Sequence, residues 1–133
     1  MRRVFLSLAL LAAAAGPALA YDACGAPPER PDLPANPAAA AASDMNGVRE
    51  ADRDFALDVE GYLVCTQLAD SDVGAEAERG DRTAASAEAL RKTFQDQAAE
   101  ARGRQSGWRD DYDRWIAAWA RAHHQPVPSR LDN

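Results

Sequence analysis

The second half of the sequence carries a long series of apolar and aromatic side chains, interrupted once by a glutamine. Its members lie three or four residues apart: Leu90, Phe94, Ala98, Ala101, Gln105, Trp108, Tyr112, Trp115 and Trp119. Residues at these separations share one face of a helix, and the spacing is close to a heptad repeat. We therefore predict a long helix that ends near His124, because Pro126 and Pro128 cannot continue it.

A second series with the same periodicity lies upstream. Its members are Met45, Val48, Ala51, Phe55, Val59, Tyr62 and Leu63. Asn36 followed by Pro37 is typical of a helix start, with asparagine as the N-cap and proline in the first turn, and Ser43 is an alternative cap. The pattern predicts another helix that ends near Ala69.

The polar segment "DSDVGAEAERG", residues 70–80, joins the two predicted helices, and Asp81 or Thr83 can cap the second one. No segment shows the alternation of a strand. Two long helices with a short connection pack most economically as an antiparallel hairpin. We predict an all-α fold in which residues 38–124 form an antiparallel two-helix hairpin and residues 125–133 form a flexible tail.

The first twenty residues have the pattern of a signal peptide. Arg2 and Arg3 precede an apolar run, and Ala18-Leu19-Ala20 matches a cleavage site. The apolar run is short for a membrane span, and no later stretch is long enough. We predict that residues 1–20 are removed and that the protein is periplasmic or secreted.

Residues 21–37 contain five prolines, at positions 27, 28, 31, 34 and 37, which favours an extended polyproline II segment. The chain has two cysteines, Cys24 and Cys65, and in an oxidising compartment such a pair usually forms a disulfide. Cys65 is predicted to lie at the edge of the apolar face of its helix. A Cys24–Cys65 bond would tie the proline-rich segment along the hairpin as a strap.

The acidic balance restricts the choice of partner. The formal net charge is −6, and loss of the two signal-peptide arginines makes it −8. Nucleic acids and anionic lipids both select lysine and arginine patches, so neither is predicted as a partner.

Several of these features occur together in one known group of proteins. The cysteine after the signal, "PDLP", "SDM", "GYLVC" and the long second helix resemble uncharacterised small exported helical-hairpin proteins of Gram-negative bacteria. The resemblance covers residues 24–68 and, loosely, the second helix. It implies the hairpin fold and supplies no catalytic residues.

Candidates for catalysis or metal binding are few. His123 and His124 are adjacent, so on a helix their side chains point about 100° apart and cannot chelate one ion together. Three clustered acids, Asp110, Asp111 and Asp113, diverge in the same way. No G-x-S-x-G, H-E-x-x-H or glycine-rich phosphate motif occurs. We predict no enzyme, no cofactor and no metal site.

Trp108, Tyr112, Trp115 and Trp119 place four large aromatic side chains on one face of one helix end. They can form the core by packing on Met45, Val48 and Phe55 of the first helix, or they can form an interaction surface. The sequence thus favours a non-enzymatic structural or interaction protein that contacts a protein partner or itself. The alternative is a small-molecule or metal-binding periplasmic module that uses the acidic faces and the histidine pair.

Overall fold

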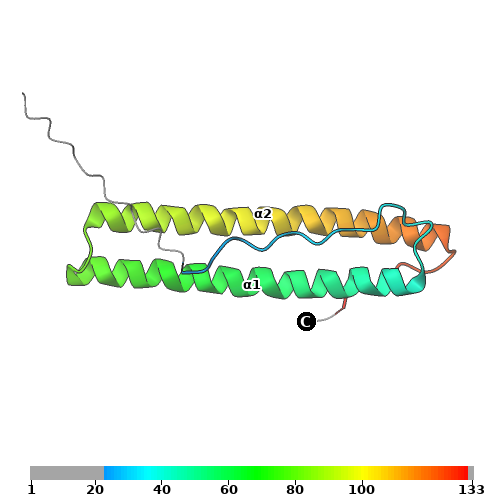
Figure 1. Cartoon of the computed structure of the whole chain (residues 1–133), viewed down its shortest axis with the longest axis horizontal. Helices are drawn as coiled ribbons and strands as arrows, with labels where there is room; N and C mark the ends of the chain where they lie inside the picture. Colours follow the sequence, from blue (N-terminus) through cyan, green and yellow to red (C-terminus); the bar gives the residue numbers. More distant parts are fainter. Residues whose placement is uncertain (1–22, 132–133) are drawn as a thin grey trace, which may run out of the picture.

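The computed structural model describes residues 23–131, and within them it contains two helices and no strand. Helix α1 spans Ala42–Arg79 and helix α2 spans Ala84–Ala122. They run side by side in opposite directions and are joined by a turn at one end (Figure 1). The predicted all-α antiparallel hairpin is confirmed, whereas the predicted signal peptide lies outside the described residues. Neither α1 nor α2 contains an apolar stretch long enough to cross a membrane.

Helix α1 continues ten residues further than the sequence predicts, so the predicted end near Ala69 is wrong. Val73 is completely buried and belongs to a small core cluster with Ala87 and Phe94 of α2. Burial of one side chain per turn is enough to keep this polar segment helical once α2 lies against it. Gly80 ends the helix with a φ of 78°, a conformation that glycine adopts without strain.

The starts of the two helices differ in how well they were predicted. Thr83 caps α2, as one of the two predicted candidates, and its hydroxyl accepts a hydrogen bond from the Ser86 N–H at 3.2 Å. Asn36 caps only an isolated turn, in which its side chain accepts from the Ala38 N–H at 3.0 Å. Helix α1 begins later, at Ala42, where the Asp44 carboxylate accepts from the Ala41 N–H at 2.8 Å.

The larger core cluster lies where the beginning of α1 meets the end of α2. Its large members are Met45, Val48, Phe55, Val59, Tyr62, Trp108, Tyr112, Trp115, Ile116 and Trp119. Phe55 and Trp108 meet edge to face, with their ring centroids 6.1 Å apart. The aromatic end of α2 therefore packs on the predicted apolar residues of α1.

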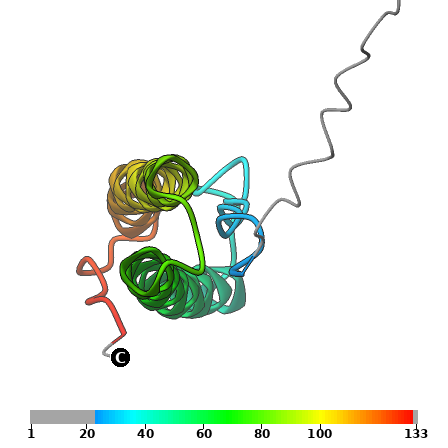
Figure 2. The ribbon, with the colours of Figure 1, turned by 90° about the vertical axis from the view of Figure 1, so that its left-hand side faces the viewer.

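A disulfide joins Cys24 to Cys65, as the cysteine count predicted. From Cys24 the chain runs alongside the hairpin to the start of α1 (Figure 1). We call residues 24–41 the N-terminal segment. Seen along the helix axes, this segment lies on one side of the helix pair and the chain after α2 lies on the other (Figure 2). The two irregular segments thus flank a layer of two helices.

The disulfide is expected to contribute a large part of the stability of so small a fold. Replacing both cysteines with serine should lower the free energy of unfolding by about 4 kcal/mol, because the bond closes a loop with a sequence separation of 41 residues. Urea unfolding of the oxidised protein and of the double variant measures this difference. A reductant should lower the free energy of unfolding of the wild type by the same amount and should leave that of the double variant unchanged. A loss below about 1 kcal/mol would contradict this account of the bond.

Candidate functional site

The four aromatic residues that the sequence offered as an interaction surface are buried. The exposed fractions are 1% for Trp108 and Tyr112, 6% for Trp115 and 5% for Trp119. Of the two alternatives left open by the sequence, the structure therefore has these side chains in the core.

The indole N–H groups of the three tryptophans each donate a hydrogen bond. Trp108 donates to the buried Asp52 carboxylate at 2.9 Å. Trp115 donates to the Pro34 carbonyl at 2.8 Å, and Trp119 donates to the Ala40 carbonyl at 3.0 Å. Buried indole N–H groups need such acceptors. Two of the three tryptophans thereby fasten the N-terminal segment to α2.

Arginines fasten the same segment further along. Arg104 donates to the carbonyls of Pro27 and Pro28 at 2.9 and 3.0 Å. Arg30 pairs with Asp111 of α2, and this hydrogen bond holds the pKa of the Asp111 carboxyl below its usual range. A Cβ at Gly107 would lie 3.2 Å from the Arg30 guanidinium, so this glycine leaves room for Arg30 to approach α2.

The chain after α2, predicted to be a flexible tail, makes defined contacts up to residue 131. The Arg130 guanidinium lies 4.6 Å from the centre of the Tyr112 ring and donates to the Asp113 carboxylate at 2.9 Å. A longer contact of 3.5 Å joins Arg130 to Asp52. Arg49 of α1 donates to the Ser129 carbonyl at 3.1 Å. Cation–π and charge contacts thus hold this segment against both helices.

The histidines and the clustered acids do not converge on one point. His123 stacks on Trp119 with ring centroids 4.5 Å apart, and its Nδ1 lies 2.9 Å from the Trp119 carbonyl oxygen. Asp111 turns toward Arg30, and Asp113 turns toward Arg130. Within residues 23–131, no three His, Cys, Asp or Glu side chains are grouped so that they could hold a metal ion.

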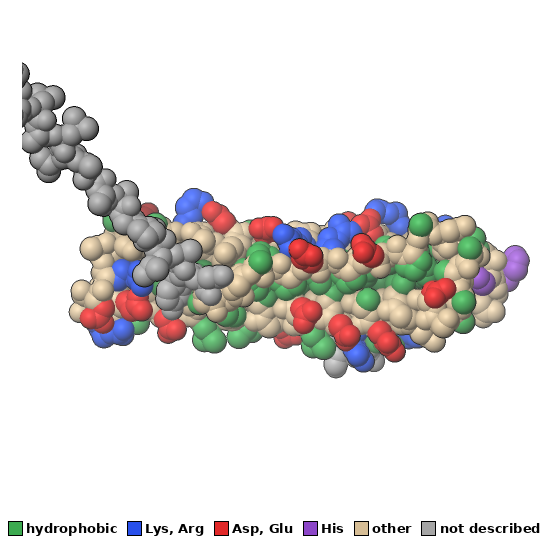
Figure 3. Space-filling view, in the orientation of Figure 1, with side chains coloured by type: hydrophobic (Ala, Val, Ile, Leu, Met, Phe, Trp, Pro, Cys, Tyr) green, Lys and Arg blue, Asp and Glu red, His purple; other side chains and the backbone are tan. Residues whose placement is uncertain are grey.

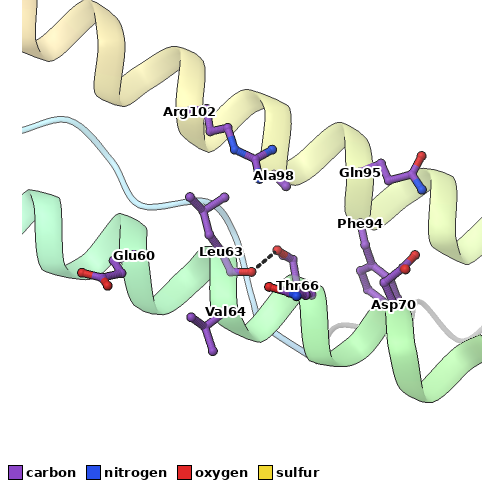
Figure 4. Close-up of a pocket in the computed structure, with 10 residues that line it drawn as sticks. Glu60, Leu63, Val64, Thr66, Asp70, Phe94, Gln95, Ala98 and Arg102 are labelled. Carbon is purple, nitrogen blue, oxygen red and sulfur yellow. Dashed lines mark hydrogen bonds between the residues drawn. The ribbon is translucent and has the colours of Figure 1, made fainter.

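A shallow groove of about 330 Å³ lies between the helices in the half of the hairpin nearer the turn (Figure 4). Leu63 and Thr66 line it from α1, and Phe94 and Arg102 line it from α2 (Figure 4). The Thr66 hydroxyl donates to the Leu63 carbonyl at 2.9 Å. Asp70, at the edge of the groove, pairs with Arg91 at 3.0 Å. These polar groups are held by contacts within the chain.

The outward face of α1 gathers exposed apolar side chains. Among residues 23–131, three of the four large apolar side chains that are exposed lie there: Leu57 at 46%, Val64 at 52% and Leu68 at 62%. Together with Gly61 they are spaced four, three and four residues apart, so they share one face, and we call these four residues the outer stripe. The completely buried Val59 lies roughly 200° around the helix from Leu57, so the stripe points away from α2.

Figure 3 shows apolar side chains along the free edge of α1, with acidic side chains between them. The outer stripe was not predicted from the sequence. The spacing of these four residues could have indicated the stripe. It forms a shorter pattern than the apolar series that begins at Met45 on the opposite face of the same helix, and that longer series dominates the sequence.

The hydrogen bond from Trp115 to the Pro34 carbonyl is expected to keep the N-terminal segment in place. Trp115→Phe keeps most of the ring and removes the donor, so the free energy of unfolding should fall by about 1–3 kcal/mol. Proteolysis after Glu29 by a glutamate-specific protease should become faster, because the segment is released from α2. The matched control, Trp108→Phe, removes a donor whose acceptor lies on α1. Equal acceleration in both variants would contradict a specific role of Trp115.

The Tyr112 hydroxyl is buried and has no hydrogen-bond partner among the described residues. Burial raises the pKa of this hydroxyl, and the nearby Asp52 carboxylate raises it further. The folded state therefore favours the protonated Tyr112 hydroxyl over the ionised one. The free energy of unfolding keeps its full value below pH ~10 and falls as the pH rises through the raised pKa. Tyr112→Phe should leave stability near pH 7 unchanged or higher and should reduce the loss in alkali. Urea titrations across this pH range measure both effects, and a clear loss near pH 7 would contradict the prediction.

No protein-family model, no curated protein and no solved structure matches this chain.

Proposed function

We propose that this chain is a non-enzymatic, exported protein of the cell envelope that acts by contact between its outer stripe and another protein. The observation that carries the proposal is the concentration of exposed apolar side chains on the outward face of α1, with three of the four in the described residues in one stripe. Scattered apolar residues are normal on a surface, whereas aligned ones are typical of a contact site.

Two features support the envelope as the location. Residues 1–20 have the pattern of a signal peptide, and the chain has a disulfide between Cys24 and Cys65. Disulfides persist in exported proteins and are rare in the cytosol. The resemblance to small exported hairpin proteins of Gram-negative bacteria points in the same direction.

The alternative from the sequence, a small-molecule or metal-binding module, has less support. His123 is stacked on Trp119, and the clustered acids Asp111 and Asp113 turn toward different arginines. The contact function needs none of these groups. It uses side chains that are 46–62% exposed.

The test is photo-cross-linking in intact cells of the native host. A benzophenone amino acid at position 64, in the outer stripe, should give discrete covalent adducts with another polypeptide. The same amino acid at position 127 is the matched control, because Val127 is exposed to 63%, about as much as Val64, and lies outside the stripe. No adduct at position 64, or the same adducts at both positions, would contradict the proposal.

A further inference from the structure

The outer stripe has the geometry of a seam for a helix. Leu57, Gly61, Val64 and Leu68 occupy alternating d and a positions of a heptad, the positions through which two helices interlock. The stripe is about 16 Å long at the rise of an α-helix. Apart from its two chain neighbours and the nearby backbone of α1, no described atom lies within 4 Å of a Cβ placed on Gly61. This glycine therefore leaves a hollow between its larger neighbours, which a side chain of a second helix can enter.

The stripe is bordered by negative charge. Between residues 50 and 72 the chain has seven acidic residues and one basic residue. Two of the acids are engaged in the fold: Asp52 contacts Trp108 and Arg130, and Asp70 pairs with Arg91. The other five are exposed: Glu50, Asp54, Asp58, Glu60 and Asp72. The single base, Arg53, pairs with Asp54 at 2.9 Å. The other four exposed carboxylates form no ion pair with a described residue.

We propose that the occupant of the outer stripe is an amphipathic helix whose apolar seam is flanked by lysine or arginine. This inference rests on the proposed contact function and names the chemistry of its partner. The apolar seam packs on Leu57, Val64 and Leu68. The basic flanks lie beside the exposed carboxylates, which sets the orientation of the helix and raises the rate of association.

A second copy of this chain fits less well. A two-fold antiparallel pairing would place Leu57 against Leu68 of the second copy, and the same register would bring the Arg53–Asp54 ion pair beside Asp72. Because that ion pair carries no net charge, a second copy offers the exposed carboxylates less attraction than a basic helix does. The carboxylates also repel an anionic lipid surface.

The probe is a synthetic three-heptad peptide with leucine at a and d and lysine at e and g, titrated into the oxidised mature protein by fluorescence anisotropy. Binding is expected at low salt and should weaken at high salt. Two control peptides are used. One has the same composition in scrambled order, and the other has glutamate in place of lysine. Neither should bind comparably, because one lacks the seam and the other has the wrong charge.

Variants of the protein separate the two contributions. Leu57→Ser with Leu68→Ser should weaken binding by about tenfold or more, and so should Asp58→Lys with Asp72→Lys. All four side chains are exposed, and circular dichroism checks that the variants remain folded. The matched control Val127→Ser should bind like the wild type.

The proposal would be overturned if the lysine and glutamate peptides bind equally well, or if neither peptide binds. Sedimentation equilibrium that shows a dimer, dissociated by Leu57→Ser with Leu68→Ser, would also overturn it, because the occupant would then be a second copy. If the lysine peptide fails while position 64 still cross-links in cells, the contact function stands and only the partner chemistry is wrong. If both fail, both proposals fall.

Discussion

The indole N–H groups of α2 impose the constraint on which the rest of the structure depends. A layer of two helices has no third element to cover large aromatic rings, yet each buried indole needs a hydrogen-bond acceptor. Trp108 finds Asp52 across the layer, whereas Trp115 and Trp119 reach backbone carbonyls of the N-terminal segment. An irregular, proline-rich chain suits this task. Its turn uses the carbonyls of Asn36 and Pro37 internally and leaves those of Pro34 and Ala40 to the indoles. The disulfide fixes one end of that segment, and α1 continues from the other.

This constraint divides the hairpin into two unequal halves. Where α1 begins and α2 ends, the core holds three tryptophans and is flanked by irregular chain on both sides (Figure 2). Near the turn, the core shrinks to Ala69, Val73, Ala87 and Phe94. Apolar stabilisation follows the area removed from water, so the free energy of folding is concentrated in the aromatic half. The outer stripe lies on the middle of α1, and changes on its solvent side leave the aromatic core intact.

The regular parts of this fold could be predicted from the sequence, and the irregular parts could not. Periodicity identified both helices and the pairing of Phe55 with the aromatic end of α2, and cysteine count identified the disulfide. The last turns of α1 were missed because Val73 is the single large apolar residue between Ala69 and Gly80, which is too few for a recognisable periodic series. Whether Trp115 was core or surface depended on a carbonyl of Pro34, and no sequence period encodes that contact. Arg130 is likewise held by individual contacts with Tyr112 and Asp113, which no sequence period encodes.

The composition of the outer stripe argues that it is more than incidental exposure. Leucine is a good helix former, so Leu57 and Leu68 alone could be explained by helix propensity. Gly61 and Val64 cannot be explained in this way. Glycine costs about 1 kcal/mol relative to alanine inside a helix, and valine is also unfavourable there. Nothing described in this chain packs on the Gly61 position, and Val64 is 52% exposed. Residues that weaken a helix on a largely exposed face are expected where the surface has another use, and a hollow beside apolar side chains is the shape that a second helix requires.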